Sequence, residues 1–512
     1  MNRSKNSIRN ILFGVGGQIL NILMSFAYRT VFMHTLSDEY LGINGVFTNI
    51  LMVFSLADLG VGTAIIFALY KPIAENDVKK IKALMKMYAR AYILIGFIII
   101  GMGLVCLPFI EHLIKTDVVI PHVKLIFMIF VLNTASTYFF AYKGTLITAN
   151  QKHYIVSSVV YGTSVLCYAV QMVVMVLTKN YLLTLSIQVG TNILQNLITM
   201  RIADKMYPYL KEKNDEELSL RERRRIFRNM GSLMFYRTGQ VIINGTDSII
   251  ISKFQGIVEA GIYSNYSLVT TTIKNLMLQV FNAITGSIGN LAAVESEKRK
   301  YEVYNLIYFG NFWMFGFCSV CLFVLLNPFI TIWAGPDRLL TMTQVFFIVL
   351  NFYLIGMRNV NLTFRDTMGI FREGRFIPII SAIVNVGVSI FTASQWGLIG
   401  AFIGTTVSML TTLVWMEPVI LFRYGFQRSV WPYFAKYLLY FASTVLATAL
   451  TWMIAGLLPG SFLGFVGKLF ICLVVPNLIF LLLYGRTREF REVYSRVMGV
   501  VRRKFRGKRG NA

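Results

Sequence analysis

The chain has 512 residues, of which 56% are hydrophobic and only 14% are charged. A soluble protein of this composition would leave far too much apolar surface in water, so the composition excludes a soluble globular fold and indicates an integral membrane protein. The net charge of +25 does not indicate a nucleic-acid partner, because the basic residues lie in short loops and a tail beside apolar stretches, where anionic membrane lipids are the nearer partner.

Apolar stretches long enough to cross a bilayer recur along the whole sequence. A transmembrane helix needs about 20 mostly apolar residues. Fourteen stretches meet this requirement, near 8–34, 41–70, 85–110, 119–142, 154–178, 182–200, 230–254, 258–291, 301–327, 341–365, 376–394, 398–422, 437–458 and 463–484. No connection between them has the strand and helix pattern of an inserted soluble domain. The sequence therefore predicts an all-α integral membrane protein with about 14 transmembrane helices.

Basic residues are concentrated on alternate connections between these spans. If the N-terminus is cytoplasmic, 40 of the 49 Lys and Arg residues fall on inner segments, five on outer segments and four within spans. Basic loops resist translocation, so an excess of this size fixes the orientation of a multi-pass protein. We expect a protein of the cell (cytoplasmic) membrane with both termini in the cytoplasm.

Two short similarities indicate an internal duplication. A turn with an acidic residue followed by Gly-Ile occurs after span 1 (Glu39, Gly42, Ile43) and again after span 7 (Glu259, Gly261, Ile262). Leu132-Asn133 and Leu350-Asn351 also match, each ahead of a basic cytoplasmic turn, and both offsets are close to 218 residues. Chance matches between apolar segments are the alternative explanation. A duplicated unit of six spans would insert both copies the same way up, related by an axis along the membrane normal.

The duplication predicts two pseudo-symmetric six-helix bundles followed by two C-terminal helices. The expected parts are a first bundle over 1–207, a cytoplasmic linker over 208–229, a second bundle over 230–424, two further helices over 425–485 and a basic amphipathic cytoplasmic tail over 486–512. The tail places apolar side chains at helical spacing beside many arginines, which is typical of a helix that lies on a membrane surface.

Cysteine and histidine spacing gives no metal or cofactor signal. All five cysteines lie in apolar stretches, and the CxxC spacing of Cys318 and Cys321 has no second ligand pair nearby. The four histidines do not have metal-ligand spacing either. We therefore expect no metal site and no cofactor.

Charged residues inside the apolar stretches are the best pointer to function, because a charge in hydrocarbon is costly and usually faces a cavity or a partner. They occur in spans 1, 2, 7 and 8, the corresponding spans of the two copies, as Arg29, Asp58, Arg237, Asp247 and Lys274. The helical rise of about 1.5 Å per residue places Arg29 and Asp247 near the outer end of their spans. It places Asp58, Arg237 and Lys274 in the inner third of the membrane. This pattern predicts one central watery cavity that is positive at its inner end.

Arg29 and one further charge have simpler explanations. The Arg29 side chain could extend to the outer lipid headgroups as readily as it could line a cavity. Glu417, next to Pro418 at the inner end of span 12, is expected to be interfacial.

The span arrangement, the charges in spans 1, 2, 7 and 8, and the acidic turn followed by LADLGVGTAI resemble the polysaccharide-transporter branch of the multidrug/oligosaccharidyl-lipid/polysaccharide (MOP) flippase superfamily. The resemblance covers nearly the whole chain and rests on architecture more than on a sharp motif. It implies a flippase, not an enzyme, that moves undecaprenyl-diphosphate-linked oligosaccharide from the inner to the outer leaflet by alternating access, for capsule or related envelope polysaccharides. It also implies a polysaccharide polymerase as a partner.

The charged and polar side chains can be given roles in such a flippase. Arg237 and Lys274 would engage the anionic diphosphate on the cytoplasmic side. The full predicted substrate-binding set is Arg29, Arg237, Asn244, Lys274 and Asn275. Asp58 and Asp247 are candidates for gating or for binding a coupling proton or sodium ion.

Two alternatives remain open. A drug/cation antiporter of the same superfamily would favour surplus carboxylates, whereas the buried charges here are three cations and two anions. A membrane glycosyltransferase would use Asp38 and Glu39 in the first external loop as catalytic or metal-binding acids, but the external loops are too short to build a donor site.

Overall fold

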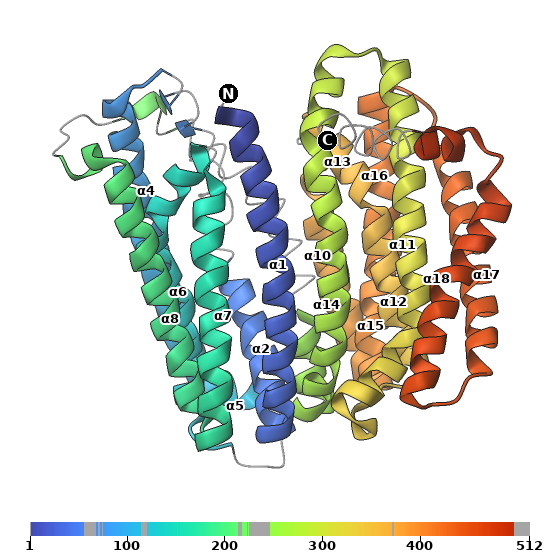
Figure 1. Cartoon of the computed structure of the whole chain (residues 1–512), viewed down its shortest axis with the longest axis horizontal. Helices are drawn as coiled ribbons and strands as arrows, with labels where there is room; N and C mark the ends of the chain where they lie inside the picture. The colour runs from blue at the N-terminus through green and yellow to red at the C-terminus, as the bar shows by residue number, and fades with distance from the viewer. Residues whose placement is uncertain are drawn as a thin grey trace, which may run out of the picture. The chain divides into compact units, whose positions relative to one another are not determined.

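The computed structural model describes residues 2–55, 68–69, 72–73, 75–113, 120–150, 152–212, 218–222, 224, 246–370 and 373–495 (Figure 1). All regular secondary structure in these residues is helical. Each of the fourteen predicted spans coincides with a helix or with the described part of one. The prediction of an all-α membrane fold is confirmed.

The first part of the chain forms a series of long helices joined by short connections. They are α1 (Asn2–Thr35), α2 (Asp38–Phe54), α4 (Val78–Cys106), α6 (Val123–Ala149), α7 (His153–Thr178) and α8 (Tyr181–Met206), with short elements η2 (Leu107–Phe109), α5 (Ile110–Leu113) and η3 (Pro208–Lys211). A further helix covers residues 246–255.

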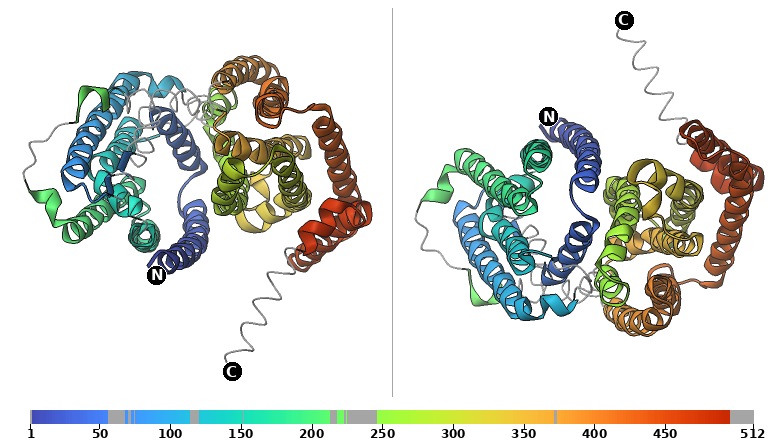
Figure 2. Two further views of the ribbon diagram at one scale, coloured as in Figure 1. Left: turned by 90° about the horizontal axis from the view of Figure 1, so that it is seen from above. Right: turned by 90° about the horizontal axis from the view of Figure 1, so that it is seen from below.

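The second part repeats this plan and adds two helices. It comprises α10 (Ile257–Val294), α11 (Glu297–Ala334), η4 (Pro336–Arg338), α12 (Met342–Met357), α13 (Asn359–Thr367), α14 (Ile377–Trp396), α15 (Leu398–Ser408), η5 (Met409–Leu413), α16 (Val414–Ile420), η6 (Leu421–Phe426), α17 (Trp431–Gly456) and α18 (Phe462–Tyr484). The segments η5 and η6 are π-helical. Figure 2 shows the long helices of each part nearly end-on, as expected for bundles of membrane-spanning helices.

In the described part of the chain, eight helices are long and apolar enough to cross a membrane, and a ninth qualifies if the bent pair Val123–Phe139 and Tyr142–Ala149 is one span. Helices α1, α8 and α10 also exceed 20 residues, the length that a span requires. The protein is therefore a multi-pass membrane protein.

Side-chain caps fix several helix starts. The Asp77 carboxylate accepts a hydrogen bond from the Lys80 backbone N–H at 3.0 Å, at the start of α4. Asn180 does the same for Leu183 at 3.1 Å, and Thr341 and Gln344 form a capping box at the start of α12. Each cap satisfies a backbone donor that a helix start leaves without a partner, so the connections can stay short.

The chain packs as two compact units, residues 1–264 and 265–512. The break falls inside α10, whereas the sequence placed the division in the linker 208–229. Most of that linker lies outside the described residues, so its role as a domain boundary stays a prediction. Glu222, in its described part, accepts a hydrogen bond from Lys80 of α4, which lowers the pKa of this carboxyl.

The two matching Gly-Ile turns explain why the first turns of α10 belong to unit 1. A Cβ built at Gly42 would collide with the backbone carbonyl of Ile257, and a Cβ at Gly261 would lie 2.9 Å from the carbonyl oxygen of Asp38. The offset between the copies relates these contacts to each other, since 42 corresponds to 261 and 38 to 257. The two glycines that indicated the repeat therefore lie at one close crossing of α2 and α10, where each glycine faces the backbone of the other helix.

In unit 2, α17 and α18 pack against α11 and not only against each other (Figure 1). The rings of Phe312 and Tyr440 stack with centroids 4.1 Å apart, and Phe480 lies 5.0 Å from Phe312. Part of the predicted tail joins this cluster, because Phe490, in the helix 488–495, stacks on Trp313 of α11. The rest of the tail, 496–512, lies outside the described residues.

Candidate functional site

Four of the seven predicted site residues lie in the described part of the chain. Asp58, Arg237 and Asn244 fall outside it. Of the others, Arg29 and Asp247 belong to unit 1, and Lys274 and Asn275 to unit 2. A common cavity for all seven therefore stays a prediction, and the described residues are placed one unit at a time.

Arg29 is held inside unit 1 by a polar and aromatic surrounding. Its guanidinium donates a hydrogen bond to the hydroxyl of Ser264 on α10, beside the glycine crossing. Tyr181 of α8 lies close by, where its hydroxyl accepts a hydrogen bond from Asn44 at 3.2 Å and its ring packs 5.5 Å from that of Phe32. Arg29 thus links α1 to α10. Its guanidinium has a hydrogen-bond acceptor within the protein and does not need a lipid headgroup as its partner.

Asp247 is partly buried in the helix 246–255. It shares unit 1 with Arg29, and the predicted place of both residues near the outer end of a cavity stays a prediction.

Lys274 lies in α10 of unit 2 and is partly buried. Among the described residues, no hydrogen bond or ion pair satisfies its ammonium. The next residue, Asn275, is exposed. A cation in a membrane helix normally pairs with another group or faces water, so Lys274 is suited to receive an anion.

The structure also contains a buried ion pair that the sequence analysis missed. Arg358, between α12 and α13, donates through Nε and a terminal nitrogen to the two carboxylate oxygens of Glu417 on α16, at 2.9 and 2.7 Å. The side chains are only 5% and 1% exposed. This two-bond geometry is the strongest that an arginine and a carboxylate form. Glu417 is therefore not the interfacial side chain that the sequence analysis expected.

Unit 1 has an ion pair between the corresponding helices, though not at the corresponding residues. Lys143 on α6 lies 2.5 Å from Asp204 on α8, and both side chains are about 15% exposed. In the duplication, α6 corresponds to α12 and α13, and α8 to the run from α15 to η6. Each unit thus joins its fourth and sixth spans by a cation and a carboxylate near the predicted cytoplasmic end.

A second polar contact joins the same spans in each unit. The side-chain oxygen of Asn133 on α6 accepts a hydrogen bond from Asn192 on α8 at 2.8 Å. In unit 2, the side-chain oxygen of Asn351 accepts one from Thr406 on α15, also at 2.8 Å. Asn133 and Asn351 are the residues that the sequence analysis matched across the repeat. Each unit thus joins its fourth and sixth spans by one ion pair and one side-chain hydrogen bond, although the partners of Asn133 and Asn351 do not lie at the repeat offset, since Asn192 would correspond to residue 410.

A signal for the missed pair was present in the sequence. A carboxylate inside an apolar stretch needs a cation nearby, and Arg358 lies within the stretch 341–365. The sequence analysis found internal charges only in spans 1, 2, 7 and 8 and so treated span 10 as free of them. That description was wrong for span 10.

Unit 2 also has an apolar pocket of about 280 Å³ between α11, α12 and α17. Aromatic and aliphatic side chains line most of it, including Phe323, Phe346, Tyr353, Phe441 and Trp452. Its chemistry fits a hydrocarbon chain and not a charged group.

Comparisons with known proteins identify the family and the fold. The model of the family described as "Polysaccharide biosynthesis protein" matches residues 7–288, more than half of the chain. A structure of the lipid II flippase MurJ in an inward closed conformation is similar with a TM-score of 0.66 and 12% identity, covering 93% of this chain and 99% of MurJ. No curated protein sequence matches the chain.

Two transporter structures are similar as well. A multidrug resistance MATE family transporter of the MOP superfamily, inward-facing, has a TM-score of 0.60 and 14% identity, covering 78% of this chain and 94% of its own. A MATE transporter of Vibrio cholerae has a TM-score of 0.58 and 10% identity, covering 84% of this chain and 99% of its own. At such identities the likeness shows the fold alone, which is that of membrane flippases and transporters. The chain belongs to the polysaccharide biosynthesis protein family.

Proposed function

We propose that this protein flips an undecaprenyl-diphosphate-linked oligosaccharide from the inner to the outer leaflet of the cell membrane by alternating access, with both termini in the cytoplasm. The family match and the transporter fold support a flippase. The observation that carries the proposal for the substrate is Lys274, a partly buried cation in a membrane helix whose ammonium has no partner in the described part of the chain. An anionic diphosphate would supply that partner.

The remaining predicted residues complete the proposed path. Arg237 would share the diphosphate with Lys274, and Asn244 and Asn275 would bind sugar hydroxyls. Arg29 would close the outer end, where its hydrogen bond to Ser264 already joins α1 to α10. Asp58 and Asp247 would gate the path or bind a coupling proton or sodium ion, and a polysaccharide polymerase would receive the flipped product.

The apolar pocket of unit 2 offers a place for part of the prenyl chain. Its lining is aromatic and aliphatic, and it lies between helices that span the membrane. The charged headgroup and the hydrocarbon chain of one substrate would then contact chemically different parts of unit 2.

Substitution of Lys274 tests the proposal. We expect Lys274→Gln to abolish outer-leaflet appearance of labelled lipid-linked oligosaccharide in vesicles, because the amide keeps the size of the side chain but removes its charge. Lys179→Gln, at an exposed turn between α7 and α8, is the matched control and should flip at the normal rate. Unchanged flipping by Lys274→Gln at equal protein levels would contradict the role of this residue.

The MATE-like alternative is distinguished in the same vesicles. A drug/cation antiporter would export a cationic dye in response to an ion gradient and would not need Lys274. Dye export that survives Lys274→Gln, with no flipping of the glycolipid, would favour the antiporter.

A further inference from the structure

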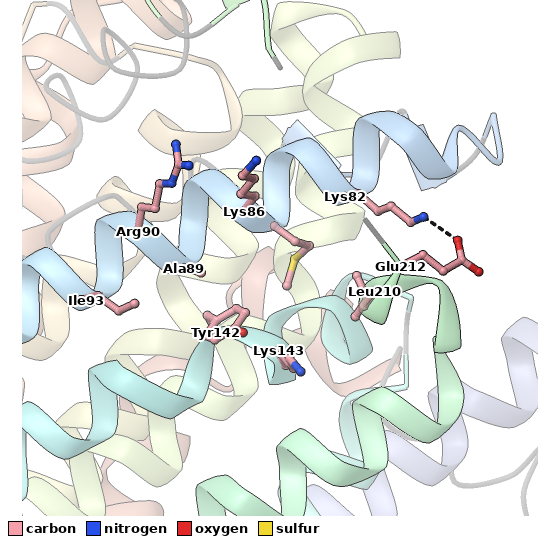
Figure 3. A pocket seen from close by; sticks show the side chains of 10 residues that line it. Lys82, Lys86, Ala89, Arg90, Ile93, Tyr142, Lys143, Leu210 and Glu212 are labelled. Carbon is pink, nitrogen blue, oxygen red and sulfur yellow. Dashed lines mark hydrogen bonds and ion pairs between the residues drawn. The ribbon is translucent and has the colours of Figure 1, made fainter. Parts of the chain in front are cut away.

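A basic pocket lies at the predicted cytoplasmic end of unit 1, and none of the seven residues assigned to the substrate path lines it. It has a volume of about 480 Å³ and is formed by α4, α6 and the segment around η3. Four cations and one carboxylate contribute to its lining, namely Lys82, Lys86, Arg90, Lys143 and Glu212 (Figure 3).

Two of the four cations already have anionic partners. Lys82 lies 2.6 Å from Glu212, the contact drawn as a dashed line in Figure 3. Lys143 lies 2.5 Å from Asp204. These pairs hold η3 and α8 beside α4 and α6, so the pocket is built before any ligand enters.

The other two cations, Lys86 and Arg90, are exposed, and no described residue forms a hydrogen bond or ion pair with either. They lie one helical turn apart on α4, and Figure 3 shows both side chains extending from the same edge of that helix. Two adjacent cations on one edge of a preformed pocket are suited to a phosphate group, which accepts several charge-assisted hydrogen bonds.

The helix face that carries these cations continues as an apolar face. Ile93 is the lining residue of α4 farthest from the predicted cytoplasmic end, and Phe97 and Leu104 follow at helical spacing, with 43%, 61% and 54% of their surfaces exposed. In a membrane-spanning helix such side chains contact hydrocarbon. The stripe from Lys86 to Leu104 therefore changes from cationic to apolar along one face, which is complementary to an amphiphile with an anionic head and an apolar tail.

We propose that this pocket binds the phosphate headgroup of an anionic phospholipid, with Lys86 and Arg90 on the phosphate and the acyl chains along Ile93, Phe97 and Leu104. Basic pockets between helices at the cytoplasmic side of a membrane are suited to such headgroups. The bound lipid would fill the gap between α4 and α6 at the membrane surface. The site does not depend on the proposed transport function.

Native mass spectrometry of the full-length protein, released from phosphatidylcholine nanodiscs that contain phosphatidylglycerol or cardiolipin, tests the site. The double variant Lys86→Gln/Arg90→Gln should bind the anionic lipid about 30-fold more weakly, because each cation near an anionic headgroup contributes about 1 kcal/mol and 1.4 kcal/mol is tenfold. The conservative exchange Lys86→Arg/Arg90→Lys should keep the binding. The control Lys298→Gln/Arg423→Gln removes two exposed cations of unit 2 and should leave the binding unchanged.

Three results would overturn the proposal. Equal lipid binding by the double variant and the wild type would show that the pocket is not the site. Binding of inorganic phosphate as tight as that of the lipid would remove the role of the apolar stripe. Displacement of the phospholipid from the wild type by undecaprenyl diphosphate, together with weaker undecaprenyl diphosphate binding by the double variant, would assign the pocket to a transported lipid instead. A loss of flipping without a loss of phospholipid binding would concern only the proposed function.

Discussion

At the scale of single residues, the buried pair of Arg358 and Glu417 shows what apolar periodicity cannot predict. Hydropathy finds a span whether or not it contains one charge, but the pairing depends on which two spans are neighbours in space. Glu417 is only 1% exposed, and its two carboxylate oxygens accept the two bonds of one guanidinium. The sequence supplied both residue types, but only the fold shows that they meet.

We predict that Arg358→Gln strongly destabilises the protein, because it leaves the Glu417 carboxylate buried without its cation. Breaking a buried pair on one side costs about 3–5 kcal/mol, whereas replacing both partners with apolar residues is often neutral. The melting temperature of the purified protein in one detergent should therefore fall for Arg358→Gln and recover in Arg358→Met/Glu417→Leu.

Lys436→Gln is the matched control for this experiment. Its partner is Glu489, and the two side chains are 33% and 25% exposed, so the loss should be below about 1 kcal/mol. Equal losses of stability for Lys436→Gln and Arg358→Gln would show that burial does not increase the contribution of the Arg358–Glu417 pair to stability.

At the scale of helices, the sequence predicts where spans lie better than where they break. Each predicted span coincides with helix in the residues that the structure describes, because apolar length is read directly from the residues. The break between α12 and α13 at Arg358 and the π-helical turns of η5 and η6 were not predicted. These irregularities depend on neighbouring helices, which no single window of sequence contains. The contact between the two Gly-Ile turns was missed for the same reason, although the turns themselves were found.

The glycine crossing predicts that a side chain larger than hydrogen destabilises the protein at residue 42 but is tolerated three residues later, at residue 45. Gly42→Ala should lower the stability by about 1–3 kcal/mol, because its Cβ would overlap the Ile257 backbone and α10 would have to move. Gly45→Ala is the matched control, since its Cβ would meet the Ser264 Cβ at an ordinary 3.4 Å. Thermal denaturation and the amount of folded protein in the membrane measure both. An undisturbed Gly42→Ala variant would argue against a tight crossing.

At the scale of the whole molecule, the duplication explains more than the order of the spans. The sequence indicated it only through two short matches, and both lie at contacts in the fold. Gly42 and Gly261 meet at one crossing, and Asn133 and Asn351 each accept a hydrogen bond from the sixth span of their own unit. The predicted substrate cavity could not be assembled in the same way. Asp58, Arg237 and Asn244 lie outside the described residues. The predicted cavity therefore rests on the charges of the predicted residues and on their positions along the spans.

The two C-terminal helices are expected to be essential for the stability of unit 2. A chain that ends at residue 429 would lose α17 and α18, and with them the hydrogen bonds from Asn361 to Tyr433 at 3.1 Å and from Trp313 to Asn477 at 2.8 Å. Polar groups left without partners in hydrocarbon are costly, so this chain should melt at a lower temperature. A chain ending at Ser495 keeps both helices and is the control. Equal melting temperatures for the two truncations would contradict this role.

The reciprocity of the glycine crossing bears on how such a chain arose. In a half-length ancestor, residues 38 and 42 of one copy would have met residues 42 and 38 of a second copy, so the ancestor could have assembled as a twofold-symmetric dimer through a self-complementary contact. A single substitution in this contact would have changed both sides of it, because the two copies were identical. After gene fusion each side was free to diverge, and it has done so: Asp38 now faces Gly261, Ile257 faces Gly42, and the position equivalent to Gly45 became Ser264, the acceptor for Arg29. Fusion thus permitted an asymmetric polar contact that a homodimer could only have made in duplicate.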